Sequence, residues 1–352
     1  MANVNALKVN VSLSRTTRHL VLLSVVVFLS FLSIGVPLPV LPLYVSGDLY
    51  FGSWVIGIVM GGSAIVTLLT RVQAGRLADA FGSKKIVLCG IACCVISSVA
   101  NLLSLAEMTS EQALAILLMG RVLLGCGESM VMTGAIAWGI SLVGKTQVAK
   151  VISWLGLAMY SATMVVGAPL GGWALDYQGL VLVFIFSLSF PLLGFVISLP
   201  LPAVPVLTDK SNPIPLSQML RIVAIPGVIM GLGAVGFAIV SAYLSLLYLE
   251  RAWENVGFSL MALGIAYVVM RLFFLSTIQR FGAMQVVMAM LLTEAVGQIL
   301  IWQAVRPEIA LLGSMLTGVG YSLILPACSV IVVRYAPEQG RSAIMGLYLA
   351  FF

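Results

Sequence analysis

The sequence is poor in charge and contains a single histidine. Aspartate, glutamate, lysine and arginine make up 9% of its 352 residues, whereas about a quarter of a typical soluble domain is charged. With 61% hydrophobic residues and a mean hydropathy of +1.14, the chain is too apolar for a soluble protein, and we predict an integral membrane protein. The lone histidine, His19, argues against histidine-based metal sites and catalytic triads.

Cysteines and acids also lack the spacing of an enzyme or a metal site. All five cysteines fall within long apolar runs, where disulfides are not expected, and we predict that they are small packing residues: Cys89, Cys93, Cys94, Cys126 and Cys328. The chain has no paired aspartates, no His/Glu metal spacing and no nucleophile motif. We therefore expect no enzyme, no catalytic residue and no metal.

Long apolar runs dominate the chain instead. A spanning helix needs about 20 such residues. Ten segments meet this length: Leu20–Val45, Leu49–Thr70, Ile86–Ala106, 112–141, Val151–Leu175, 177–208, Ile222–Leu249, 256–278, 282–304 and Ile309–Val333. Glycine and proline occur within them, as membrane helices tolerate. The predicted fold class is an all-α integral membrane protein.

Basic residues are distributed unequally between the loops. With the N-terminus in the cytoplasm, one side collects Lys8, Arg15, Arg18, Arg71, Arg76, Lys84, Lys85, Lys145, Lys150, Lys210, Arg221, Arg280, Arg334 and Arg341, and the other only Arg251 and Arg306. That other side collects the acids Asp48, Glu107, Glu111, Asp176, Glu250, Glu254 and Glu308. The bias predicts a multi-pass protein with a cytoplasmic N-terminus. We assign the net charge of +6 to topology and lipid attraction, with no nucleic-acid partner.

The sequence repeats itself weakly. A shift of 200 residues superposes Arg71, Phe81, Gly82 and Val87 on Arg271, Phe281, Gly282 and Val287, and a shift of 193 superposes Leu118, Gly120, Gly125, Gly127 and Ser129 on Leu311, Gly313, Gly318, Gly320 and Ser322. Such parallel repeats predict two pseudo-symmetric six-helix bundles. We place the first at residues 1–200, a cytoplasmic linker at 201–222 and the second at 223–352.

Two six-helix halves need twelve helices. The eleventh is expected to begin near Gly340-Arg341, and the remaining residues 342–352 would rise only about 16 Å as a helix, against a hydrocarbon core of about 30 Å. The sequence is therefore expected to be truncated in helix 11, with about ten complete spans and a second bundle made of helices 7–10.

The segment Gly75–Lys85 carries the sharpest motif. It is a glycine-punctuated turn with one acid and three bases between two apolar runs: Gly75, Arg76, Asp79, Gly82, Lys84 and Lys85. The pattern resembles the loop between helices 2 and 3 of major facilitator superfamily (MFS) transporters. That resemblance implies a cytoplasmic gate, in which Asp79 holds the two halves together and Gly340-Arg341 is a plausible acceptor.

Two further motifs fit this resemblance. In helix 4, Arg121 precedes Glu128 in a pattern similar to that of proton-coupled members. Burial and the Arg121 charge act on the Glu128 carboxyl in opposite senses, which can poise it to bind and release a proton. We predict that Glu128 is the main proton site, with a structural network as the alternative. In helix 5, Gly167, Pro169, Gly171 and Gly172 resemble an antiporter motif, although plain helix packing explains them equally well.

Glu294 lies in the middle of helix 9, usually a peripheral helix in this fold. It is a further proton-coupling candidate, but a structural role with hydrogen bonds to Thr293 or Gln298 is favoured. The substrate cavity is expected between the two halves, and its candidate lining residues are Pro39, Trp154, Tyr160, Tyr243, Ser245 and Tyr321. Aromatic residues among few charges suit an amphipathic organic substrate.

The chain as a whole resembles the bacterial YhhS/YfcJ branch of the superfamily, often grouped with sugar- or drug-efflux permeases. This implies a monomeric secondary transporter of the bacterial inner membrane, with rocker-switch alternating access and export of a small organic solute against inward proton flow. The proton gradient replaces a cofactor; the partners are solute, protons and lipid. A proton-coupled importer and a truncated, non-transporting remnant remain as alternatives.

Overall fold

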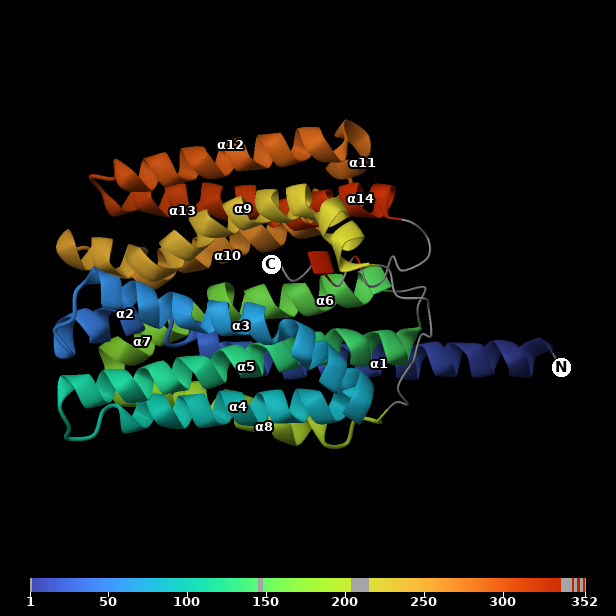
Figure 1. Cartoon of the computed structure of the whole chain (residues 1–352), viewed down its shortest axis with the longest axis horizontal. Helices are drawn as coiled ribbons and strands as arrows, with labels where there is room; N and C mark the ends of the chain where they lie inside the picture. Colours follow the sequence, from blue (N-terminus) through green and yellow to red (C-terminus); the bar gives the residue numbers. More distant parts are fainter. Residues whose placement is uncertain are drawn as a thin grey trace. The chain divides into compact units, whose positions relative to one another are not determined.

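The computed structural model describes residues 2–144, 148–203, 215–336, 344, 347, 348 and 351. Its described elements are all helical (Figure 1): α1 (Ala2–Gly35), α2 (Leu41–Leu43), η1 (Tyr44–Asp48), α3 (Ser53–Phe81), α4 (Ser83–Leu103), α5 (Ser110–Val143), α6 (Val148–Tyr160), η3 (Ser161–Gly167), α7 (Ala168–Gln178), α8 (Leu180–Ser198), α9 (Leu216–Glu250), α10 (Val256–Phe273), α11 (Thr277–Phe281), α12 (Ala283–Trp302), α13 (Pro307–Ser322) and α14 (Ile324–Tyr335). The elements η1 and η3 are π-helices.

Ten stretches of the described chain are long and apolar enough to cross a membrane. They follow the ten runs predicted from the sequence, so the all-α membrane fold is confirmed. Two spans contain irregular turns. The first α-helix ends at Gly35, because Pro37, Pro39 and Pro42 follow it and have no N–H to continue the ladder. In the fifth span, η3 stands directly before Pro169 in α7, a π-turn that sequence periodicity does not predict.

The chain forms two compact units. Unit 1 comprises residues Met1–Ile34, Gly62–Ala162 and Val181–Thr208. Unit 2 comprises Gly35–Gly61, Thr163–Leu180 and Asp209–Phe352. Two segments that precede the linker in sequence therefore pack with the helices that follow it. Residues 204–214 of the linker and the predicted start of helix 11 at Gly340-Arg341 lie outside the described residues.

Related helix pairs organise the two units. In unit 1, α4 and α5 run side by side, and in unit 2 α12 and α13 do the same (Figure 1). The helices α4 and α12 both begin after a glycine with positive φ, Gly82 at 93° and Gly282 at 89°, a conformation that favours glycine. These are the positions that the 200-residue shift superposes. The repeat thus appears in local geometry as well as in sequence.

Candidate functional site

A stripe of polar side chains on α3 faces α5 inside unit 1. Ser63, Thr67 and Arg71 lie four residues apart and therefore share one face of α3. The opposing side chains on α5 are Arg121 and Glu128. The Nη2 atom of Arg121 donates to Ser63 Oγ at 2.9 Å, and only 4% of the Arg121 side chain is exposed. An arginine buried this deeply in an apolar bundle requires polar neighbours, and α3 supplies them.

Glu128 lies at the other end of this stripe. The hydroxyl of Thr67 is 3.3 Å from Glu128 Oε2 and also lies 3.0 Å from the carbonyl oxygen of Gly125. The charges of Arg71 and Arg121 both act on the Glu128 carboxyl. One partly buried carboxyl thus lies between two helices, near one hydroxyl and within the electrostatic influence of two cations. This arrangement can respond to gain or loss of a single proton.

Gly125 makes the contact between these helices possible. A Cβ atom at Gly125 would collide with the carbonyl oxygen of Ser63 and would lie 2.8 Å from Val66 Cβ. Unit 2 contains the same arrangement, since a Cβ at Gly318 would collide with the carbonyl oxygen of Leu263. There, the residue that corresponds to Glu128 is Tyr321. The close helix contact is therefore made without a carboxyl in the second repeat.

Sequence reasoning identified Arg121 and Glu128 but missed their partners on α3. It counted Arg71 among the cytoplasmic loop charges, whereas Arg71 lies inside α3. It did not single out Ser63 or Thr67. The missed signal is the spacing of four residues between Ser63, Thr67 and Arg71 in an otherwise apolar helix, which places three polar groups on one face.

The gate motif occupies the end of α3 and the start of α4. Arg76, Asp79 and Lys85 are exposed, and Gly75 approaches Thr133 of α5. Lys84 instead points to the end of α8, where its ammonium donates to the carbonyl oxygens of Leu199 and Leu201, both at 2.7 Å. The expected acceptor of Asp79, Gly340-Arg341, lies outside the described residues. The gate role of Asp79 therefore stays a prediction.

The Lys84 contacts predict a measurable effect on stability. Replacing Lys84 with methionine should lower the free energy of unfolding by about 1 kcal/mol, because two carbonyl groups beyond the end of α8 lose a charged donor. Thermal unfolding of the detergent-solubilised protein measures this loss. The neighbouring exposed Lys85→Met is the control and should leave the unfolding temperature unchanged; equal effects would contradict the assignment.

The antiporter-like motif lies at the start of α7, in unit 2. A Cβ atom at Gly171 would collide with the carbonyl oxygen of Val36, whereas Gly172 has open space. Pro169 packs against Gly257 of α10, where an added Cβ would lie 3.1 Å from Pro169 Cα. Gly167 is the residue before α7 and has helical backbone angles. The motif therefore joins α7 closely to two other segments of its unit.

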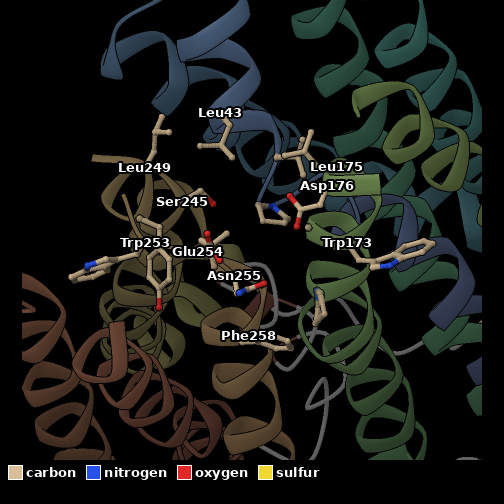
Figure 2. Close-up of a pocket in the computed structure, with 17 residues that line it drawn as sticks. Leu43, Trp173, Leu175, Asp176, Ser245, Leu249, Trp253, Glu254, Asn255 and Phe258 are labelled. Atoms are coloured by element: carbon tan, nitrogen blue, oxygen red, sulfur yellow. The ribbon is translucent and has the colours of Figure 1, made fainter. Parts of the chain in front are cut away.

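A cavity of about 740 Å³ opens beside this motif. Its walls come from α2, α7, the end of α9 and the start of α10, all in unit 2: Pro39, Val40, Leu43, Pro169, Gly172, Trp173, Leu175, Asp176, Ser245, Tyr248, Leu249, Trp253, Glu254, Asn255, Val256, Gly257 and Phe258. Figure 2 shows the polar ends of Asp176, Ser245, Glu254 and Asn255 directed toward one central space. The indole rings of Trp173 and Trp253 point away from it.

The chemistry of this cavity favours a ligand that donates hydrogen bonds. Asp176 and Glu254 are exposed carboxyl groups, and Asn255 adds an amide. Ser245 is 2% exposed, and its hydroxyl has no hydrogen-bond partner among the described residues. Sequence reasoning named Pro39 and Ser245 for a substrate cavity, but it assigned Asp176 and Glu254 only to loop charge. Their convergence depends on which helix ends meet, which no local pattern encodes.

The other predicted cavity residues lie elsewhere. Trp154 and Tyr160 belong to α6 in unit 1, where Tyr160 is buried and Trp154 is 42% exposed. In unit 2, the Tyr243 hydroxyl lies 3.4 Å from the carbonyl oxygen of Ser53. Tyr321 is buried and stacks on Phe237, with ring centroids 5.2 Å apart.

Glu294 is buried in α12, with 4% of its side chain exposed. The hydrogen bonds favoured from the sequence are not made: Thr293 donates to the carbonyl oxygen of Ala289, and Gln298 donates to Gly236 and to the hydroxyl of Thr317. Among the described residues, no group of three or more His, Cys, Asp or Glu side chains could hold a metal ion.

Comparison with known proteins agrees with this architecture. The family model described as Major Facilitator Superfamily matches residues 23–262. An uncharacterized MFS-type transporter of Salmonella typhimurium is 38% identical over 331 residues, covering 94% of this chain and 84% of that protein. The uncharacterized MFS-type transporter YhhS of Escherichia coli is 35% identical over 325 residues, covering 92% and 80%.

A solved structure titled as a D-xylose–proton symporter superposes with a TM-score of 0.74 at 14% identity, covering 95% of this chain and 86% of that one. At this identity the likeness concerns the fold. The helical architecture, the family match and the relatives together confirm the resemblance to YhhS-like proteins. The chain is a multi-pass membrane protein that belongs to the major facilitator superfamily of transporters.

Proposed function

We propose that this protein exports a small organic solute in exchange for protons, by alternating access. The observation that carries the proposal is the polar stripe between α3 and α5. There, the positive charges of Arg71 and Arg121 act on the Glu128 carboxyl, and Thr67 lies beside it. Charged groups within a membrane bundle are costly and mark ion pathways. The antiporter-like motif at Gly167–Gly172 supports exchange as the mode of transport.

A proton on Glu128 would change the attraction between α3 and α5. The ionised carboxyl is drawn to Arg71 on α3 and to Arg121 on its own helix. Once protonated, the Glu128 carboxyl can still form a hydrogen bond with the Thr67 hydroxyl. It loses its ionic attraction to Arg71 and Arg121. The two helices are then free to shift relative to each other, which links proton binding to a conformational change.

The cavity in unit 2 supports an amphipathic cation as the solute. Two carboxyl groups, an amide and the Ser245 hydroxyl, which has no hydrogen-bond partner within the described chain, converge there, and the remaining lining is largely apolar. A cationic head would be matched by Asp176 and Glu254, while an apolar body would contact residues such as Leu43 and Phe258.

A proton-flux assay in membrane vesicles tests the proposal. Everted vesicles with an acidified lumen receive benzyltrimethylammonium, a permanent cation that cannot dissipate the gradient as a weak base, or D-xylose as a neutral comparison. We expect the cation to release luminal protons only in vesicles that contain the protein. Changing Asp176→Asn and Glu254→Gln together should raise the half-saturating concentration about tenfold, because two charge contacts are lost.

The control variant changes Glu107→Gln and Glu111→Gln, two exposed acids remote in sequence from the cavity, and should behave as the wild type. Proton release with D-xylose alone would retain exchange but reject the cation as the solute class. Proton-driven accumulation in right-side-out vesicles would instead establish an importer. If neither vesicle type shows solute-dependent proton movement with a broad panel of solutes, the proposed function is wrong.

A further inference from the structure

Glu294 is the most unusual buried group in the described part of the chain. Its side chain is 4% exposed, and neither carboxyl oxygen has a hydrogen-bond partner among the described residues. An ionised carboxylate in such a place would be charged, desolvated and unpaired, an arrangement that folded proteins avoid because its cost is far greater than that of a neutral acid. The geometry therefore favours the uncharged form in this conformation.

Three helices enclose the carboxyl group. On α9, a Cβ atom at Gly236 would collide with Glu294 Oε1, and one at Gly233 would lie 3.5 Å from Oε2. On α13, a Cβ at Gly320 would lie 2.6 Å from Glu294 Cβ. Glycine at Gly236 and Gly233 leaves room for the carboxyl oxygens against α9, and glycine at Gly320 leaves room for the Glu294 side chain against α13. Because only 4% of the Glu294 side chain is exposed, a movement of α9 away from α12 and α13 would increase its contact with water.

The first repeat shows that helix packing does not need an acid here. The 200-residue shift places Glu294 on Cys94, and the 193-residue shift places Gly320 on Gly127. A Cβ at Gly127 would lie 2.9 Å from the Cys94 sulfur, so the two pairs make the same contact, each in its own unit. Cys94 is 1% exposed and fills its site as a small apolar residue. The carboxyl of Glu294 therefore adds something that packing alone does not require.

The surrounding helices offer the acid no counter-charge. Among the described residues, the ionisable side chains near this junction are Tyr321 on α13, Tyr267 and Arg271 on α10, Cys328 on α14, and Tyr348, whose hydroxyl donates to the carbonyl oxygen of Leu325 at 2.8 Å. Arg271 is engaged elsewhere: its Nη1 donates to the Tyr267 hydroxyl at 2.8 Å and to the carbonyl oxygen of Ser322 at 3.3 Å.

We infer that Glu294 is a proton-binding site, loaded while α9 covers it and able to release its proton to water when α9 separates from α12 and α13. Release converts the carboxylic acid to a carboxylate and one proton in water, and the charged form holds the junction open until a proton returns. This site is independent of Glu128 and goes beyond the proposed exchange function. It would give the second repeat a proton site of its own.

Infrared spectroscopy of the purified protein in liposomes tests the protonation directly. We expect the wild type to show the carbonyl stretch of a protonated carboxylic acid at mildly alkaline pH. The band should disappear in Glu294→Gln and in Glu294→Cys, which reproduces the residue of the first repeat and so preserves packing. It should persist in Glu128→Gln, the matched control for loss of the other buried acid. If all wild-type acids are ionised, or the band is unchanged by removal of Glu294, the inference is overturned.

Thermal unfolding supplies a second measurement that does not require the variants to transport anything. The wild type should lose about 5 °C of unfolding temperature from mildly acidic to mildly alkaline pH, since solvent takes the proton only after the junction opens. Glu294→Cys should abolish most of this pH dependence. The inference would also be rejected if sodium ions, and not a lower pH, raised the unfolding temperature of the wild type. Neither readout needs a solute, so failure of the export proposal would leave this test intact.

Discussion

Glu128→Gln is expected to abolish pH-gradient-driven transport while leaving the protein folded. The amide has the size of the carboxyl and can still accept the hydrogen bond from Thr67, but it cannot exchange a proton. For exchange of one proton per monovalent cation at fixed membrane potential, a gradient of about one pH unit supports about tenfold solute accumulation, and the variant should lose all of it. Solute uptake into vesicles with and without an imposed pH gradient measures the difference.

The proper control is Glu111→Gln, an exposed acid near the start of the same helix, which should transport as the wild type does. Solute–solute exchange, which needs no net proton movement, should survive in Glu128→Gln and would show that the variant is folded and binds its solute. Coupling that is unchanged in Glu128→Gln would remove this residue from the mechanism and leave the polar stripe as a structural network.

Gly171→Ala is expected to cause a larger loss of stability than Gly172→Ala in the α7 motif. The new Cβ would collide with the carbonyl oxygen of Val36, and a backbone atom cannot swing aside as a side chain can. Overpacking of this kind costs about 1–3 kcal/mol. The unfolding temperature in detergent and the yield of monodisperse protein both measure the effect.

Its neighbour provides a stringent comparison. Gly172 lies on the same helix with nothing within 4 Å of its Cβ position, so Gly172→Ala should be neutral or stabilise the helix by up to about 1 kcal/mol. If both substitutions behave alike, the motif acts through general helix propensity and the close contact with Val36 has no energetic weight.

The sequence predicted those parts of the fold that depend on local composition. The ten apolar runs and the repeated glycines follow from rules about bilayer thickness and helix packing. The π-turn before Pro169 was not predicted, because an extra residue in a helical turn leaves no clear trace in hydropathy.

The candidate site residues also divide into those that local composition predicts and those that only the tertiary structure brings together. Arg121 and Glu128 stood out because charge is rare inside a span. Arg71 was misplaced to a loop, since its helix continues well beyond the apolar run. Asp176 and Glu254 lie near helix ends far apart in the sequence, and only tertiary structure brings them to one cavity. For Glu294 the sequence favoured a hydrogen-bonded role, and the structure instead leaves its oxygens unpartnered among the described residues.

Of the five boundaries between the two units, four fall beside a proline, beside a glycine or within a π-helix, which are places where helices bend. They cross the chain after Ile34, beside Pro37; at the Gly61-Gly62 pair inside α3; within the π-helix η3; and next to Gly179, whose φ is 75°. If one unit is displaced, the chain is therefore expected to bend mainly at these four positions. The spans that contain these positions would bend there. Stiffening one of them, for example by replacing both Gly61 and Gly62 with alanine, should slow turnover, although neither residue binds solute or proton in the proposed mechanism.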